Sequence, residues 1–174
     1  MYSLRNNDSG STLAGNLIFH PFLWTKTGPM RDPGRFGADC GIASAIDDTG
    51  NVVGEADTPL GCTKLLGKEA EYHAFLWKKG VMTDLGTLEG NRCSGVGSIN
   101  SKGQIVGASL QGWVNFVQYA FLREDGEMVD LNTLIPPDSS LQLAAVEEIN
   151  DRGEILGDGV PAGCFYIGLW HAFL

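Results

Sequence analysis

Basic charge is scarce in this sequence, and its scarcity excludes one large class of partner. The 174 residues contain 12 Lys and Arg against 21 Asp and Glu, which gives a formal net charge of −9. No run of five basic residues occurs anywhere in the chain. Binding to a phosphate backbone requires clustered Lys and Arg, so we expect no nucleic-acid partner.

Long apolar runs are also missing. The longest segment without a charged side chain, residues 103–122, has twenty residues, but eight of them are glycine, serine, asparagine or glutamine. The carboxyl-terminal segment, residues 159–174, has sixteen residues and contains Pro161 and three glycines. A membrane-spanning helix needs about 20 apolar residues, so we expect no membrane span. The first eleven residues, MYSLRNNDSGS, are polar, and we expect no signal peptide within this chain.

The motifs that mark common enzyme chemistry are absent from the sequence. It contains no GxSxG, HExxH or GxxxxGK[ST] string, and no DxDxDG calcium loop. The four cysteines have neither CxxC nor Cys/His metal spacing. We therefore expect no catalytic activity, no bound metal and no cofactor.

The four cysteines, Cys40, Cys62, Cys93 and Cys164, leave three disulfide pairings open. Cys40 and Cys93 each precede an isoleucine by six residues and hold equivalent places in successive repeats. Equivalent positions of adjacent units usually lie too far apart for an S–S bond. A bridge that involves a loop cysteine such as Cys62 is therefore favoured over one that joins Cys40 to Cys93.

What the sequence does contain is an internal repeat. One string reads HPFLW, HAFLW, YAFLR and HAFL, with its phenylalanine at Phe22, Phe75, Phe121 and Phe173. A second string follows the first three copies as GPMRDPG, GVMTDLG and GEMVDLN. A third reads IDDTGNVVG, INSKGQIVG and INDRGEILG, and residues 6–15 form a worn copy of it. Three strings in one order at one period make chance similarity implausible.

Each unit is predicted to fold as two β-hairpins. In SINSKGQIVG, Asn100 opens a turn and Gly103 closes it, the pattern of a type I turn followed by a left-handed glycine. Gly50 and Gly153 repeat this pattern, and we predict the same device at Gly28 and Gly126 in the other hairpin. No stretch has a sustained 3.6-residue apolar period, so helix should be scarce.

Two hairpins give four short strands in each unit, which is the pattern of a propeller blade. We therefore predict one all-β domain, a β-propeller-like array of four-stranded antiparallel blades with about 3.5 repeats. The predicted units are a fragment at 1–19, repeats at 20–72, 73–118 and 119–170, and a terminal strand at 171–174. The final HAFL lacks its second string, which leaves an incomplete ring and a portion of a longer protein as alternatives. Open sheet edges would favour self-association.

The strings resemble one known family. HAFLWKKGVMTDLGTLEG followed by INSKGQIVGAS is similar to the central repeat of the HAF-repeat family of bacteria, and MVDLNTLIPPDSSLQLAAVEEINDRGEILGDG to its carboxyl-terminal unit. The resemblance implies an extracellular, secreted protein with no assigned activity, commonly preceded by further repeats and a signal sequence. The departures from the family pattern are Tyr119 for His, Arg123 for Trp, Asn132 for Gly and Pro33 for Leu.

The histidines and one set of aspartates recur with the repeat. His20, His73 and His171 share one slot, and Asp32, Asp84 and Asp130 share another. Recurrent residues usually serve the fold, so we predict packing or hydrogen bonding for the histidines and backbone N–H bonds for the carboxylates. The alternative, a metal held by histidines that converge on a central channel, would suit a hydrolase.

A binding site should use residues that do not repeat. The connections between units, residues 55–72, 110–118 and 158–169, hold four aromatic candidates for ligand binding: Trp113, Phe116, Phe165 and Tyr166. The leading hypothesis is a non-catalytic extracellular scaffold that binds a protein or glycan through these loops. The alternative is the carboxyl-terminal part of a larger secreted enzyme or sensor whose activity lies upstream.

Overall fold

The computed structural model describes residues 19–37, 40–59, 71–111 and 118–161 of the chain. These residues form an all-β structure, as predicted, with three antiparallel sheets. The first contains β1 (Gly41–Ile46), β2 (Val52–Asp57), β3 (Tyr72–Lys78) and β4 (Val81–Gly86). The second contains β5 (Cys93–Ile99), β6 (Ile105–Leu110), β7 (Gln118–Glu124) and β8 (Glu127–Asp130). The third contains β9 (Leu141–Ile149) and β10 (Ile155–Pro161), and one short 3-10 turn, η1 (Leu131–Thr133), follows β8.

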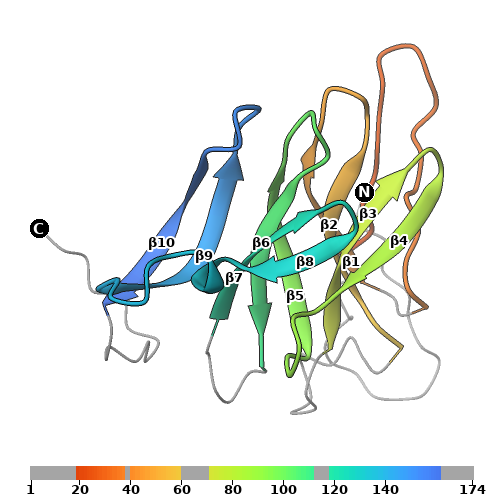
Figure 1. Ribbon diagram of the computed structural model, residues 1–174. Helices are drawn as coiled ribbons and strands as arrows, with labels where there is room; N and C mark the ends of the chain where they lie inside the picture. Colours follow the sequence, from red (N-terminus) through yellow and green to blue (C-terminus); the bar gives the residue numbers. More distant parts are fainter. Residues whose placement is uncertain (1–18, 38–39, 60–70, 112–117, 162–174) are drawn as a thin grey trace, which may run out of the picture.

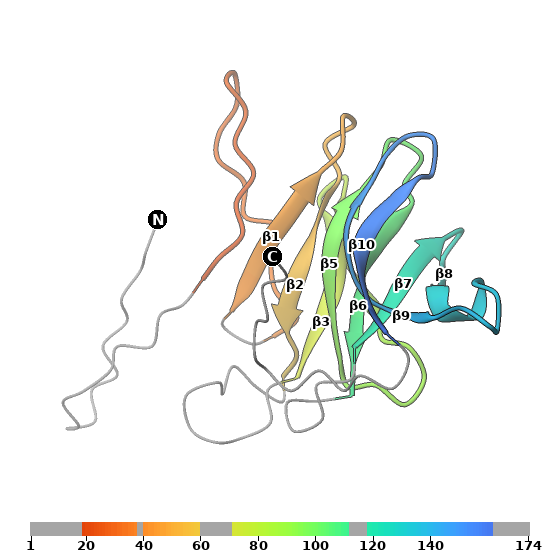
Figure 2. The same ribbon diagram turned by 90° about the vertical axis from the view of Figure 1, so that its left-hand side faces the viewer.

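The two complete sheets are meanders in which the strands lie in sequence order. The three sheets stack one behind the next, with β9 and β10 at one end of the stack and the amino-terminal hairpin at the other (Figures 1 and 2). Each complete sheet joins the third string of one predicted repeat to the first two strings of the next. The sheets therefore run across the predicted boundaries at residues 72 and 118, because a repeat period alone does not say which hairpins share a sheet.

The hairpin that opens each sheet has the predicted turn. Gly50, Gly103 and Gly153 have φ angles of 82°, 80° and 85°, which a side chain would make costly. In the second of these turns the Asn100 Oδ1 atom accepts hydrogen bonds from the N–H groups of Lys102, at 3.1 Å, and Gln104, at 3.0 Å. The side chain thus fixes the turn locally, which confirms the prediction for this hairpin.

The second hairpin of each complete sheet uses a different turn from the one predicted. Lys79 and Gly80 have φ angles of 52° and 87°, and Asp125 and Gly126 have 52° and 90°. Two consecutive positive φ angles define the two-residue type I′ turn, whose twist matches that of the flanking strands. The prediction of a type I turn with a glycine bulge at Gly126 is therefore wrong. It is wrong for Gly28 as well, which does not adopt a left-handed conformation.

The first repeat departs from the predicted pair of strands. Residues 20–33 are joined by a single bridge between Leu23 and Arg31, and neither segment forms a longer strand. Pro21 and Pro33 lack the N–H group that a ladder needs, which explains the shortening. The hairpin still packs on the first sheet, because Leu23 and Phe36 contact the cluster of Val52, Ala56, Phe75 and Trp77.

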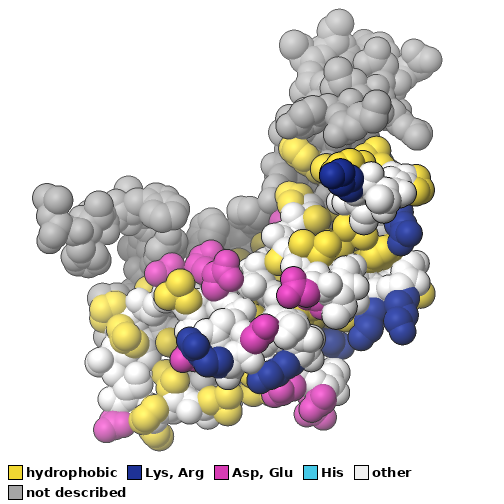
Figure 3. Space-filling model, turned by 90° about the horizontal axis from the view of Figure 1, so that it is seen from above, with side chains coloured by type: hydrophobic (Ala, Val, Ile, Leu, Met, Phe, Trp, Pro, Cys, Tyr) yellow, Lys and Arg dark blue, Asp and Glu magenta, His cyan; other side chains and the backbone are white. Residues whose placement is uncertain are grey.

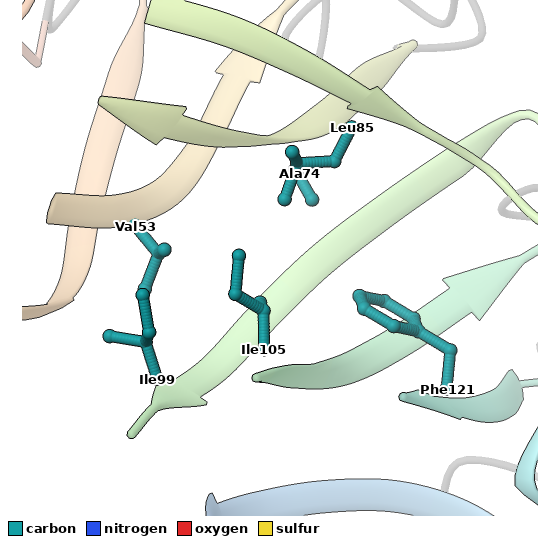
Figure 4. Close-up of a cluster of buried hydrophobic side chains, with 6 residues drawn as sticks. All are labelled: Val53, Ala74, Leu85, Ile99, Ile105 and Phe121. Atoms are coloured by element: carbon teal, nitrogen blue, oxygen red, sulfur yellow. The ribbon is translucent and has the colours of Figure 1, made fainter. Parts of the chain in front are cut away.

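The core lies between the sheets rather than within any one of them. One cluster joins Val53, Ala74 and Leu85 of the first sheet to Ile99, Ile105 and Phe121 of the second (Figure 4). A second cluster joins the second sheet to β9 and contains Val106, Ala120, Leu131, Val146 and Ile149. Apolar side chains on both faces of each complete sheet are therefore buried by stacking, as repeat proteins require.

Two polar side chains, one buried and one half-buried, also join neighbouring sheets. The Ser94 hydroxyl on β5 accepts a hydrogen bond from the Ala74 N–H group, at 2.8 Å, and donates one to the Gly86 carbonyl, at 2.5 Å. The Asn132 amide makes the corresponding connection to β9. It donates to the Leu143 carbonyl at 2.9 Å and accepts from the Leu143 N–H group at 2.7 Å. Asn132 stands where the previous repeat has Gly86, so this difference between the repeats has a structural role.

Candidate functional site

The recurrent histidines lie beside the recurrent aspartates. On the first sheet, the His73 Nδ1 atom is 2.9 Å from the nearer carboxylate oxygen of Asp84, on the neighbouring strand. His20 lies 3.7 Å from Asp32 in the amino-terminal hairpin. His171 is outside the described residues. Each described histidine thus lies beside the carboxylate of its own hairpin, and His73 is within hydrogen-bond distance of it, which supports the structural interpretation.

The aspartates make the backbone bonds predicted for them. Asp32, Asp84 and Asp130 each accept a hydrogen bond from the N–H group two residues further on, at 2.7–2.8 Å. Such a bond closes an Asx turn where a strand ends. These carboxylates are part of the fold, and the prediction for them is confirmed.

The four aromatic residues proposed as ligand contacts, Trp113, Phe116, Phe165 and Tyr166, lie outside the described residues. Their role as a binding surface stays a prediction. Two hollows in the described part of the chain, one at each end of the strands, are the remaining candidates for a site.

The first hollow has a volume of about 330 Å³ and lies where β7 and β8 meet the connection between β4 and β5. It is lined by Leu88, Glu89, Asn91, Gln111, Tyr119 and Asp130. The connection is fixed from below by Ser109, whose buried hydroxyl accepts from the Leu88 N–H group and the Asn91 side chain, at 3.1 and 3.0 Å. The part of the hollow formed by Leu88 and Asn91 is therefore fixed by hydrogen bonds, and most of its other lining side chains are polar.

Tyr119 is the residue that distinguishes this place from its equivalents. It occupies the slot of His20 and His73, and its Asp130 neighbour corresponds to Asp84. Asp130 turns one oxygen, Oδ1, to Asn132, which donates to it from its N–H group at 2.8 Å and its amide at 2.9 Å. Among the described repeats, the one that replaces histidine by tyrosine thus has a hollow at this position. Sequence reasoning noted the replacement but drew no site from it.

The second hollow, of about 540 Å³, is a groove along the turns that follow β1, β5 and β9. Its lining consists of residues 45–48, 98–101 and 148–151, which are equivalent quartets from three units. Figure 3 looks onto this end of the molecule, where both acidic and basic side chains are visible. Asn100 donates to the Asn150 carbonyl at 3.0 Å, and the Ser101 N–H group donates to Asp151 at 2.9 Å, so lining residues join neighbouring turns.

Hydrogen bonding within the turns also sets the charge of the groove. Burial by itself raises the pKa of Asp47, but hydrogen bonds from Asn51 and Thr49 outweigh it and hold this pKa below its ordinary value. The pKa of Asp151 is lowered by the Ser101 N–H group. Both carboxylates are therefore ionised acceptors of turn hydrogen bonds. The groove is built from recurrent residues that serve the fold, and it is a weaker site candidate than the hollow beside Tyr119.

A third polar cluster lies where β3 meets β5. Burial, together with the Glu55 carboxylate, raises the pKa of Tyr72 far above its ordinary value, and burial raises the pKa of the Cys93 thiol. Adding a Cβ atom at Gly95 would place it 2.9 Å from a Glu55 carboxylate oxygen. Both titratable groups are neutral at ordinary pH, and their close packing leaves little room for a ligand.

Cys40 is disulfide-bonded, and its partner lies outside the described residues. Cys93 carries a buried thiol and no disulfide. The pairing of Cys40 with Cys93 is therefore excluded, as predicted from their equivalent positions. Cys62 and Cys164 lie outside the described residues, and the favoured bridge through Cys62 stays a prediction.

Within residues 19–37, 40–59, 71–111 and 118–161, no three His, Cys, Asp or Glu side chains are placed to hold a metal ion together. The described part of the chain also contains no helix with the length and apolar character needed to cross a membrane.

No protein-family model, curated protein or solved structure matches the chain. The resemblance to the HAF-repeat family consequently stays a prediction. The case for a site in the hollow beside Tyr119 therefore depends only on the residues that line it.

Proposed function

We propose that the chain is a non-catalytic, extracellular β-repeat scaffold that binds a neutral sugar unit of a glycan in the hollow beside Tyr119. The single observation that carries the proposal is the lining of this hollow: one tyrosine ring with amide and carboxylate side chains and no Lys or Arg. A tyrosine combines an apolar face with a polar tip, and amides and carboxylates offer several hydrogen-bond donors and acceptors. This combination suits a ligand that has both C–H faces and hydroxyl groups.

The size and rigidity of the hollow support the same ligand class. A volume of about 330 Å³ is at the lower end of the range for small-molecule sites. Glu89 and Gln111 are exposed, whereas Asn91 is fixed by its bond to Ser109. A ligand would thus meet a fixed polar group on one side and adjustable ones on the other, at a small entropic cost.

The architecture proposed for this scaffold is a propeller or an arc of one, with each four-stranded sheet as a blade. The support is the meander order of the strands and the burial of apolar side chains between successive sheets. The disulfide at Cys40 supports an oxidising compartment, and with it the proposed extracellular location. The resemblance to the HAF-repeat family points to the same location.

The test is a screen of the full chain against neutral oligosaccharides, followed by calorimetric titration of any ligand found. Tyr119→His is the matched variant, because it restores the residue that the first sheet carries beside Asp84. We expect binding to weaken at least about tenfold, which corresponds to about 1.4 kcal/mol. Gln111→Ala should weaken binding as well, because Gln111 lines the hollow. This side chain is exposed, so its loss should leave the stability of the fold unchanged.

Thermal unfolding of both variants serves as the control and should match that of the unaltered chain. Failure of every neutral glycan to bind at millimolar concentration would contradict the proposal. Equal affinity of Tyr119→His and the unaltered chain would also contradict it, because binding would then lie elsewhere.

A further inference from the structure

Among the described sheets, the third differs from the other two because its second strand, β10, has no third strand beside it. β2 lies between β1 and β3, and β6 lies between β5 and β7, whereas β10 pairs with β9 alone among the described residues. β10 also stands at the end of the stack (Figure 1). A sheet edge with unpaired backbone groups readily accepts a further strand.

A glycine in each of these strands shows what the added strand should carry. A Cβ atom built on Gly54 would lie 2.9 Å from the Phe75 ring, and one on Gly107 would lie 2.8 Å from the Phe121 ring. In both sheets the phenylalanine lies directly opposite its glycine on the paired strand. The ring thus lies against the bare Cα atom of the glycine, and we call this position the seat of the ring. A side chain there would meet the ring and also the carbonyl oxygen of the first strand, which lies nearer still.

Gly157 is the equivalent glycine of β10. Among the described residues, no aromatic ring is found next to it as Phe75 is next to Gly54 and Phe121 is next to Gly107. The carbonyl of the first strand approaches Gly157 as in the other sheets, from Ala145 here. The three atoms nearest to a Cβ built on Gly157 are all backbone, the furthest at 3.2 Å, whereas a ring atom lies nearer than that in both complete sheets.

The exposure of Ile155 also indicates that no described side chain fills the position beside Gly157. Ile155 is 37% exposed, whereas its equivalents Val52 and Ile105 are 3% and 0% exposed. These residues lie on the same face of their strands as the glycine, two positions before it. In the complete sheets, Val52 and Ile105 each lie in a buried cluster that contains the aromatic ring of the third strand, Phe75 or Phe121.

We propose that the β10 edge is the docking site of the chain's own segment 170–174, which adds as a third antiparallel strand with Phe173 seated on Gly157. The segment repeats the third-strand string as HAFL. The register of the complete sheets, with Gly54 opposite Phe75 and Gly107 opposite Phe121, assigns Gly157 to Phe173.

The intervening chain has a suitable length. Fourteen residues, 58–71, connect β2 to β3, and seven, 111–117, connect β6 to β7. Counted in the same register, nine residues, 161–169, separate Val160 from Trp170. A linker within the range of the other two gives the segment a high effective concentration at the β10 edge, which favours it over a strand from a second copy.

The experiment is NMR on the full chain. In the unaltered protein we expect nuclear Overhauser contacts between the Phe173 ring and the Gly157 Hα protons, and ring-current shifts at Gly157 that match those at Gly54 and Gly107. In Phe173→Ala we expect the Gly157 shift to disappear and amide hydrogen exchange along β10 to accelerate by roughly tenfold or more. Exchange along β2 and β6 should remain unchanged.

Phe165→Ala is the matched control, since it makes the same substitution outside the proposed register and should leave β10 as it is. Absence of the Phe173–Gly157 contact in the unaltered chain would overturn the proposal without recourse to any variant. Equal exchange along β10 in Phe173→Ala and the unaltered chain would also overturn it. Exchange rates that fall as protein concentration rises would do the same, because they would show that a second copy occupies the edge.

Discussion

Ser94 offers the sharpest test of how neighbouring sheets are held together. Its side chain is fully buried, and its hydroxyl joins the Ala74 N–H group to the Gly86 carbonyl. Ser94→Ala would leave both backbone groups without this partner. A buried polar group that loses its only partner costs about 1–3 kcal/mol. Ala74 is fully buried but Gly86 is partly exposed and can bind water, so we expect a total loss of about 3 kcal/mol.

The assay is reversible unfolding in urea and by heat. For a chain of this size, a loss of about 3 kcal/mol should lower the melting temperature by roughly 6–12 °C. Ser98→Ala is the matched control on the same strand, because Ser98 is also buried but its hydroxyl lies 3.5 Å from Glu148, too far for a strong bond. If the two variants unfold at the same temperature, the reasoning about the Ser94 hydroxyl is refuted.

Three further variants test other parts of the account. Asn132→Gly should lower the free energy of unfolding by about 1–3 kcal/mol in urea titrations, because it removes two bonds to Leu143; an unchanged value would contradict this. Gly107→Ala should destabilise by at least about 2 kcal/mol, since the new methyl would meet both the Gly95 carbonyl oxygen and the Phe121 ring; equal stability would contradict this close packing. Asp47 has a lowered pKa, so its contribution is present above the ordinary aspartate value of about 3.9 and is lost as pH falls through the folded-state pKa. Melting temperatures between pH 2 and 7 should therefore show weaker acid sensitivity in Asp47→Asn than in the unaltered chain, and equal sensitivity would contradict the assignment.

The elements that could be predicted are those fixed by local chemistry. Asn100 and Gly103 determine their turn through bonds within five residues, and the repeat carries that result to the other units. The type I′ turns were missed for two reasons. Asp125-Gly126 is a dipeptide that favours this turn, but it was interpreted by analogy with the first hairpin of the unit. Lys79 gave no such signal, because lysine seldom adopts a positive φ angle. The prolines of the first hairpin indicated that its strand pairing would be disturbed. The sequence did not show that the pairing would be reduced to a single bridge, because this also depends on packing.

Contacts between sheets were beyond the reach of sequence reasoning. Ser94 and Ala74 are twenty residues apart, and no pattern in the repeat marks this serine as the link between them. The site presents an intermediate case. Tyr119 was visible as a departure from the histidine slot, but the hollow beside it depends on the connection held by Ser109. The grouping of hairpins into sheets likewise follows from stacking rather than from the repeat period.

The account depends most on the burial of apolar side chains between successive sheets. Methyl nuclear Overhauser measurements test this directly, because Val53 of the first sheet and Ile99 of the second face each other across the interface (Figure 4). The account predicts cross-peaks between Val53 and Ile99, and between Val106 of the second sheet and the cluster partners Val146 and Ile149 on β9. Cross-peaks confined to residues of the same sheet would contradict it.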